Sequence, residues 1–520
     1  MLNKSNNKEA ANIKMGIIGG GIGGCMTALR LSEEYPQATI FLFEKKEELL
    51  QGTSNRTPGR MGLGFHYVDK NTAKVYLNLT IDFTRRFYKS CPHLMVGQEY
   101  PENYPLRNGR YFIVKNFSFS EEEILETYKA LAEEYTRLVE QDSENKLFGE
   151  PHEFYRILNP EEYERDVNLG QVKLGVETRE HLLDWPQFRK FLLTEIEDHK
   201  NIHVTTNSEI KDICFSYMDT SYSLSLKKDN DLIVEKKINF IVNATWEWTD
   251  YINSKIGYYR LPRELRTNRA KVLVKVKLPD ELKEKHSMFF CMGPHCMFSN
   301  VGDGFGFITY APETNLLNST DLIPSKNYLD IINGQIPIEK QLAIAEKIVA
   351  GVSLYIPAMI NAGISEVLFG TVQVEGEADI FDPASKVHIR DYTGLSYIED
   401  GFISLSCMKL LYGYGNANTI VTWFNSFKEQ ILPLPKQIMC RISKEINPDN
   451  QLNKSLMKKT FMLTGLCFSW LIKARPVNKD PSYTVSLDNF IPNFFKKIKL
   501  NEEFHDKNKK GFFINSRLKY

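Results

Sequence analysis

Three glycines near the start of the chain have the spacing of a phosphate-binding turn. Gly19, Gly21 and Gly24 follow the apolar segment 15–18 in the pattern GxGxxG. The first glycine permits a tight bend, the second lets backbone amides approach a pyrophosphate, and the third lets a helix pack closely on a strand. The following helix directs unpaired N–H groups and the positive end of its dipole at the phosphates. The pattern predicts a bound dinucleotide.

An acidic residue stands where the sugar of such a dinucleotide would bind. Glu44 ends an apolar segment that begins at residue 38, twenty residues after Gly24. A carboxylate at this place accepts hydrogen bonds from both hydroxyl groups of an adenosine ribose, and it repels a 2′-phosphate. We therefore expect an adenine dinucleotide.

The loop after Glu44 favours a flavin over a nicotinamide. Residues 52–67, GTSNRTPGRMGLGFHY, are rich in glycine and carry serine, threonine and arginine side chains. A flavin can use such donors beside its pyrophosphate and its isoalloxazine ring, whereas an NAD enzyme has no need of them there. An NAD-linked dehydrogenase is the alternative if this loop does not contact a flavin.

The surrounding segments predict an α/β protein with two kinds of sheet. A strand at 15–18, a helix at 27–35 and a strand at 38–46 form a β-α-β unit, which implies a doubly wound, Rossmann-like parallel sheet. A second, mainly antiparallel sheet is indicated by β-branched and aromatic segments without helical crossovers between them. These segments are 110–115, 271–277, 288–292 and 305–310.

Further elements and domain boundaries follow from the same patterns. Residues 120–142 open with a capping box and continue as a helix, 339–356 form a helix that stops before Pro357, and 232–248 look like a hairpin. We expect a discontinuous FAD-binding domain, a substrate domain and a basic C-terminal helical extension. Their residues are 15–90, 150–255 and 365–430 for the first, 91–149 and 256–364 for the second, and 431–520 for the third.

Composition and charge limit the class of protein. Of the 520 residues, 42% are hydrophobic and 25% are charged, as is typical of soluble globular domains. Lys plus Arg equals Asp plus Glu at 65 each, so no excess of positive charge points to nucleic acid. The eight cysteines show no CxxC spacing, and Cys291, His295 and Cys296 lack further donors. We expect reduced thiols, a cytoplasmic protein and no metal site.

The segment 431–520 differs from the rest in charge, with 14 Lys and 3 Arg against 7 acidic residues. Its apolar run 461–472 is too short to span a bilayer and is bordered by lysines. Such a segment suits either a helix packed on the FAD-binding domain or one lying in a membrane interface. We expect packing, with peripheral membrane contact as the alternative.

Four motifs occur in the order seen in one family. They are the unit 15–45, the loop 52–67, the strand ending in Asn243-Ala244-Thr245, and the stretch 390–417. In these motifs the chain resembles the D-amino-acid-oxidase-like (DAO) FAD-dependent oxidoreductases, over about residues 15 to 425. The resemblance implies hydride transfer from a CH–OH or CH–NH carbon of a small polar substrate, anionic or sugar-like, to flavin N5. The electrons would pass to an acceptor such as oxygen or a quinone.

The resemblance also assigns residues to the cofactor FAD. The positions concerned are Gly19, Gly21, Gly24, Glu44, Thr53, Ser54, Asn55, Arg60, Ile210 and Lys409. Thr53, Ser54 and Asn55 would follow the pyrophosphate toward the flavin ring. Ile210 would contact the adenine through its backbone, and Lys409 would stabilise the negative charge of reduced flavin.

His66, Tyr67 and Arg390 are the residues expected to act in catalysis. His66 and Tyr67 lie in the loop expected beside the ring, and a histidine can accept a substrate proton near neutral pH. The alternative is that His66 only bonds the loop backbone. Arg56, Arg60 and Arg390 lie in motif loops, and guanidinium groups suit a carboxylate or phosphate. Arg390 is the preferred substrate anchor, and an arginine tied to a carboxylate between domains is the alternative.

Three sites depart from the family pattern. Gly62 stands where relatives commonly have a histidine, so covalent flavin attachment there is impossible. Thr245-Trp246 and Cys407-Met408 are larger than the residues usual at these places. Larger side chains near the flavin would narrow the pocket, and they favour the alternative of a flavin-binding scaffold or regulator without turnover.

Overall fold

The computed structural model describes residues 13–115, 119–216, 221–228, 231–259, 266–291, 296–379, 382, 385–390, 394–399, 401–406 and 409–431. These residues all belong to one compact unit. The expected extension beyond residue 431, the pair Cys407-Met408 and His295 lie outside the described residues. Within the described ranges, no helix is long and apolar enough to cross a membrane.

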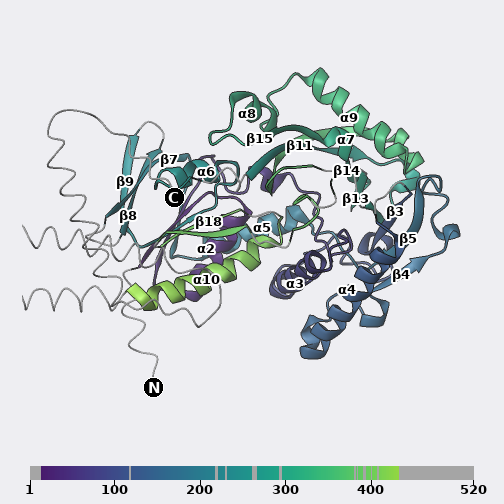
Figure 1. The fold of residues 1–520 in the computed structure, drawn as a ribbon, viewed down its shortest axis with the longest axis horizontal. Helices are drawn as coiled ribbons and strands as arrows, with labels where there is room; N and C mark the ends of the chain where they lie inside the picture. Colours follow the sequence, from purple (N-terminus) through teal and green to yellow (C-terminus); the bar gives the residue numbers. More distant parts are fainter. Residues whose placement is uncertain are drawn as a thin grey trace, which may run out of the picture. The chain divides into compact units, whose positions relative to one another are not determined.

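A six-stranded sheet carries the glycine turn (Figure 1). Its strands are β1 (Lys14–Ile18), β2 (Thr39–Phe43), β6 (Ile202–Thr205), β10 (Phe240–Asn243), β17 (Leu395–Glu399) and β18 (Phe402–Leu405). Their order is β17-β18-β10-β1-β2-β6, and every neighbouring pair is parallel except β17 with β18. The predicted parallel sheet is confirmed. Because β1, β2 and β10 run in the same direction, the segments that follow them meet at one edge of the sheet.

The two faces of this sheet are covered differently. Helices α2 (Ile22–Glu34), α5 (Trp185–Asp198) and α10 (Tyr412–Ile431) pack together on one face, where the rings of Phe240 and Phe424 are 5.0 Å apart. A small antiparallel sheet of β7 (Ser208–Ser216), β8 (Ser221–Lys228) and β9 (Asp231–Ile238) covers the other face. A hydrophobic core lies between these two sheets. It joins Ile210, Leu224 and Ile238 of the small sheet to Ile18, Phe43 and Ile241 of the six-stranded sheet.

The expected hairpin at 232–248 is wrong. Strand β9 pairs with β8, whereas β10 pairs with β1 and β18 in a different sheet. Asn239 is the single residue between the two strands, which is fewer than the two residues of the shortest common hairpin loop. Its side chain accepts a hydrogen bond from the backbone N–H of Lys14, so the chain passes from one layer directly into the next.

A separate sheet has nine strands. Its strands are β3 (Gly109–Val114), β4 (Tyr155–Leu158), β5 (Val172–Thr178), β11 (Arg266–Lys277), β12 (Ser287–Cys291), β13 (Cys296–Gly302), β14 (Phe305–Tyr310), β15 (Asn315–Ser319) and β16 (Gly363–Glu375). The order is β15-β11-β14-β13-β12-β3-β5-β4, with β16 paired to β11. All pairs are antiparallel except β12 with β3, so the predicted mainly antiparallel sheet is confirmed.

Helices connect and flank the sheets. They are α3 (Lys70–Phe87), α4 (Glu121–Gln141), α6 (Thr249–Ser254), α7 (Ala311–Thr314), α8 (Lys326–Ile332) and α9 (Ile338–Ser353). The capping box predicted for α4 is present between Ser120 and Glu123, and α9 ends before Pro357 as predicted.

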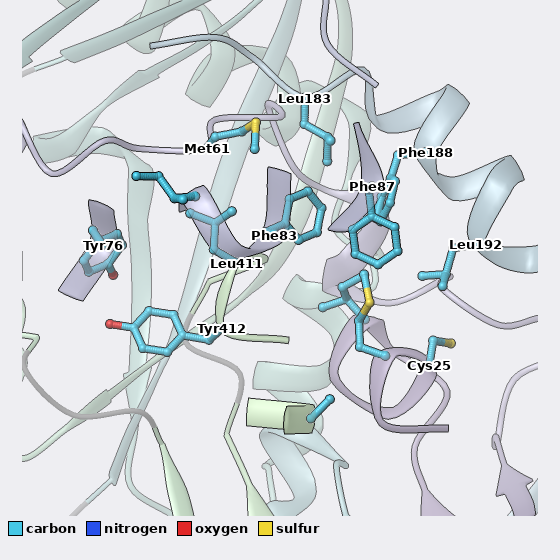
Figure 2. Packing of buried hydrophobic residues seen from close by; sticks show 14 of the residues in the cluster. Cys25, Met61, Tyr76, Phe83, Phe87, Leu183, Phe188, Leu192, Leu411 and Tyr412 are labelled. Atoms are coloured by element: carbon cyan, nitrogen blue, oxygen red, sulfur yellow. The ribbon is translucent and has the colours of Figure 1, made fainter. Parts of the chain in front are cut away.

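The main core fixes the loop that follows the glycine turn. Phe83 and Phe87 of α3 each lie 5.2 Å, ring to ring, from Phe188 of α5 (Figure 2). Met61 of the loop is buried in the same core and is among the residues labelled in Figure 2. The loop 52–67 is therefore held by packing as well as by hydrogen bonds.

Candidate active site

A cavity of about 560 Å³ lies between the carboxyl ends of the parallel strands and the nine-stranded sheet. Its lining combines residues 18–23 of the glycine turn, 244–248 after β10, 271–273 of β11 and 370–372 of β16. Open α/β sheets bind ligands in this kind of crevice, beyond the carboxyl ends of their strands.

Most of the predicted site residues meet at this cavity. Those that line it are Gly19, Gly21, Glu44, Thr53, Ser54, Arg60, His66, Tyr67, Ile210, Arg390 and Lys409. Gly24 and Asn55 are not part of the lining. A side chain on Gly24 would place its Cβ 1.9 Å from the Gly19 carbonyl oxygen, so this glycine allows the close approach of α2 to the turn. The Asn55 side chain instead accepts a hydrogen bond from Trp185 Nε1 at 3.0 Å.

The glycine turn leaves the start of α2 open toward the cavity. Gly19 has a φ of +106°, and a Cβ there would lie 2.5 Å from the Ala244 carbonyl oxygen. Gly21 is the N-cap of α2 and supplies no side-chain cap, and the first turn holds no acidic residue. The N-terminal N–H groups and the positive helix end are thus suited to an anionic ligand.

Glu44 is held in a fixed orientation at the end of β2. One carboxylate oxygen accepts a hydrogen bond from the Gly20 N–H at 2.7 Å, and the other accepts one from the Lys46 N–H at 2.9 Å. Each oxygen keeps further acceptor capacity. Nearby lining residues include Ile210 and Tyr251, which supply an apolar surface for a base.

The loop 52–67 joins the two sheets beside the cavity. The Ser54 hydroxyl accepts a hydrogen bond from the Ile22 N–H at 3.0 Å, and the Thr53 hydroxyl accepts one from the Thr371 N–H of β16 at 2.9 Å. Trp246, in the left-handed region with a φ of 55°, donates from Nε1 to the Thr371 carbonyl at 2.9 Å. Trp246, which is larger than the residue usual in the family, therefore bonds β16 and lines the cavity without filling it.

Arg60 is anchored by a buried carboxylate that the sequence did not reveal. Its Nε lies 3.1 Å from Glu180 Oε1, and its Nη2 donates to the Tyr111 hydroxyl at 2.5 Å. Tyr111 in turn bonds Glu180, and Glu180 Oε2 accepts from the Leu63 N–H at 2.9 Å. The alternative of an arginine tied to a carboxylate, considered for Arg390, therefore describes Arg60. No motif marks Glu180, since it is distant in sequence and follows an ordinary strand.

The surroundings of His66 define its tautomer. Nδ1 lies 3.5 Å from Arg60 Nη1 and 3.4 Å from Cys291 Sγ. Arginine is only a donor, and burial raises the pKa of Cys291 to about 12, so the thiol keeps its proton. Nδ1 must therefore accept, and the neutral ring carries its hydrogen on Nε2. Burial, followed by the charge of Arg60, holds the pKa of His66 well below its ordinary value.

Lys409 and Arg390 bring further positive charge to the same end of the cavity. Lys409 Nζ lies 4.7 Å from the ring centroid of Tyr76 and 5.3 Å from that of Tyr67. Burial, followed by the charges of Arg60 and Arg390, holds the pKa of Lys409 well below its ordinary value. The Arg390 N–H donates to the Thr72 hydroxyl at 3.0 Å, which ties this residue to α3.

Two cavity residues on β11 were missed by the sequence analysis. Arg269 and Lys271 both line the cavity from this strand. The strand itself was predicted for 271–277, but its alternation of charged and apolar residues is also what a half-exposed strand shows. Which face meets a ligand follows only from the packing of the two sheets.

The donor set fits FAD. A glycine turn and a helix start whose first turn holds no acidic residue suit its pyrophosphate, and the fixed carboxylate of Glu44 suits its ribose. The lysine and arginine side chains at the other end suit the negative charge of a reduced flavin. Gly62 carries no side chain that could attach the flavin covalently.

Comparisons with known proteins identify the family to which the chain is similar. The family model for FAD dependent oxidoreductases (DAO) matches residues 14–372. A mitochondrial L-2-hydroxyglutarate dehydrogenase of Caenorhabditis elegans is 28% identical over 156 residues, which cover 26% of this chain and 36% of that protein. The match thus spans about a third of that relative.

Solved structures with the same fold include two oxidases. Glycine oxidase from Geobacillus kaustophilus has a TM-score of 0.52 and 12% identity, with 79% of this chain and 94% of that chain covered. The L-alpha-glycerophosphate oxidase of Mycoplasma pneumoniae, solved with FAD bound, has a TM-score of 0.50 and 18% identity over the same shares, 79% and 94%. With its family match and its glycine turn at the cavity edge, the chain belongs to the DAO family of FAD-dependent oxidoreductases.

Proposed function

We propose that the protein oxidises a CH–OH or CH–NH carbon of a small polar substrate, and that its electrons then pass to oxygen, a quinone or another acceptor. The observation that carries this proposal is a single cavity with a dinucleotide-type turn at one end and a cluster of His66, Arg390 and Lys409 at the other. FAD, when bound, supplies the hydride acceptor at N5. The chain's own residues would bind the cofactor and would bind, orient and polarise the substrate.

The lining residues support the following proposed cofactor contacts. Gly19, Gly21 and the start of α2 would hold the pyrophosphate, and Glu44 the ribose hydroxyls. Thr53 and Ser54 would lie along the way to the ring. The backbone of Ile210 would meet the adenine. Lys409 would face the ring's pyrimidine edge and offset its charge after reduction.

His66 is better suited to donate a hydrogen bond than to accept a proton. Its Nδ1 already faces the Arg60 guanidinium donor and lies 3.4 Å from the Cys291 sulfur, so its neutral tautomer presents Nε2–H. We propose that Nε2–H bonds the substrate oxygen or nitrogen and so positions the reacting carbon. This revises the expected role of His66 as a base, while Tyr67 forms the wall beside it.

Anaerobic mixing of the FAD-loaded protein with panels of hydroxy acids, amino acids and sugars tests the proposal. Loss of the flavin absorbance band with at least one class of compound is the expected result. Hydroxy acids belong in the panel because the curated relative is named for a 2-hydroxy acid. If the oxidised spectrum persists with every class, the chain is a flavin-binding scaffold, and the proposed turnover is refuted.

A further inference from the structure

Trp246 adopts a backbone conformation that favours glycine. Its φ is 55°, in the left-handed region. A Cβ atom is crowded in this region, so a bulky residue there has a free-energy cost that glycine would not have. Such strain persists only where the surrounding structure enforces it, and it occurs preferentially at functional sites. The reason for a tryptophan at this position must therefore lie in its side chain.

The edge strand β16 offers the Trp246 side chain a bonding partner. β16 pairs with β11, and within the described ranges no strand pairs with its other edge. Thr371 of β16 directs two backbone groups to that edge. The Thr53 hydroxyl accepts from the Thr371 N–H, and Trp246 Nε1 donates to the Thr371 carbonyl, both at 2.9 Å. Because Thr371 is fully buried, these two bonds satisfy groups that water does not reach.

The backbone of Trp246 is held by the same strand. The Gln373 side-chain amide of β16 donates to the Trp246 carbonyl at 2.8 Å and to Asn268 Oδ1 of β11 at 2.7 Å. The Thr249 hydroxyl donates to the same Trp246 carbonyl at 2.6 Å. The two bonds that join Trp246 to β16, from Nε1 to the Thr371 carbonyl and from Gln373 to the Trp246 carbonyl, are called the Trp246 bridge below.

The Trp246 bridge joins two walls of one cavity. Thr53, Trp246 and Thr371 all line this cavity, which has the glycine turn at one end and Lys409 at the other. The sheets are complete without the bridge, because β10 pairs with β1 and β18, and β16 pairs with β11 from residue 363 to residue 375. Its bonds therefore act on the separation of the walls and leave the strand pairing within each sheet unaffected.

We propose that Trp246 retains the bound FAD by holding β16 against the segment 244–248. A cofactor that extends from the glycine turn to the cationic end lies along both walls, and it leaves only after the Trp246 bridge has opened. The strained backbone at residue 246 places the indole N–H at the Thr371 carbonyl, which glycine could not reach. This inference concerns retention of the cofactor and goes beyond the proposed oxidation, so the two can fail independently.

Exchange of bound FAD for radiolabelled FAD in the full-length protein measures retention without turnover. Trp246→Phe keeps an aromatic ring but loses the donor, and Trp246→Gly also relieves the backbone. We expect both variants to release FAD about threefold to tenfold faster than the unaltered protein, as for the loss of one hydrogen bond. Trp423→Phe, which removes another partly buried indole that does not line the cavity, is the matched control and should release FAD at the unaltered rate.

The rate of FAD association separates retention from general damage to the fold. Opening a wall makes entry at least as fast as in the unaltered protein, whereas a distorted site binds FAD more slowly. Quenching of FAD fluorescence on mixing with the FAD-free full-length protein gives this rate. We expect both Trp246 variants to bind FAD no more slowly than the unaltered protein. Trp246→Gly is the second variant because its backbone tolerates a φ of 55°.

Several results would overturn retention by the Trp246 bridge. Unchanged release in Trp246→Phe would show that the hydrogen bond is not used, and faster release in Trp246→Gly alone would assign retention to the bulk of the ring. Equal acceleration in Trp423→Phe, slower association, or failure of both Trp246 variants to fold would show a structural role only. A protein that no compound bleaches refutes the proposed oxidation, and the release rates still decide the role of Trp246.

Discussion

Replacing Glu180 by glutamine removes the charge that neutralises buried Arg60 and keeps the size of the side chain. Glu180 is buried, lies 3.1 Å from Arg60 Nε and accepts the Leu63 N–H at 2.9 Å. Removing one partner of a buried ion pair costs about 3–5 kcal/mol, because the other charge stays buried without compensation. We expect the Glu180→Gln variant to lose stability of this order and to hold the loop 52–67 less firmly.

Urea unfolding followed by tryptophan fluorescence measures this loss of stability as a lower urea concentration at the unfolding midpoint. The matched control is Glu126→Gln, because Glu126 pairs with Lys70 at 2.9 Å on the surface. Breaking this exposed pair should change the stability little, because water solvates both charges once they separate. The reasoning is refuted if Glu180→Gln and Glu126→Gln unfold at the same urea concentration.

Three further changes test the cavity. Glu44→Ala should weaken FAD binding about tenfold or more in a fluorescence titration, since charge-assisted hydrogen bonds to the ribose are lost. The control Glu47→Ala, at an exposed residue, should bind FAD like the unaltered protein. Equal FAD affinities of the two variants would show that Glu44 does not bind the ribose. His66→Ala should keep FAD but slow anaerobic bleaching, and an unchanged rate would show that His66 does not touch the substrate. Because the pKa of His66 is far below 6.5, the bleaching rate of the unaltered protein should show no His66 inflection near that pH. Gly24→Ala should yield no FAD-binding protein, because its Cβ would lie 1.9 Å from Gly19 O; a folded variant with normal affinity contradicts the close packing of α2.

The dinucleotide end of the site could be predicted because its determinants are local. The glycine turn and Glu44 lie within one β-α-β unit, so spacing along the chain fixes their spacing in space. The antiparallel segments were predicted for a similar reason, since each carries its own β-branched and aromatic pattern. Asn55 shows the limit of such predictions, because its side chain turns to Trp185 and away from the cavity.

The substrate end could not be predicted because its contacts are long-range. Arg60 and Glu180 are 120 residues apart in the chain. Lys271 reaches the cavity because β11 pairs with β16, which in turn bonds the loop 52–67. The prediction of a hairpin at 232–248 failed for a related reason. The two strands are neighbours in the sequence and have the composition of a hairpin, but each pairs with a strand of a different sheet.

The flavin content of the purified full-length protein is the most direct test that FAD spans the cavity between the glycine turn and the cationic end. Absorption spectra before and after denaturation, with chromatography of the released cofactor, measure it. We predict one FAD per chain, with no covalent attachment at Gly62, which offers no side chain. A colourless protein that also fails to bind added FAD would contradict the account.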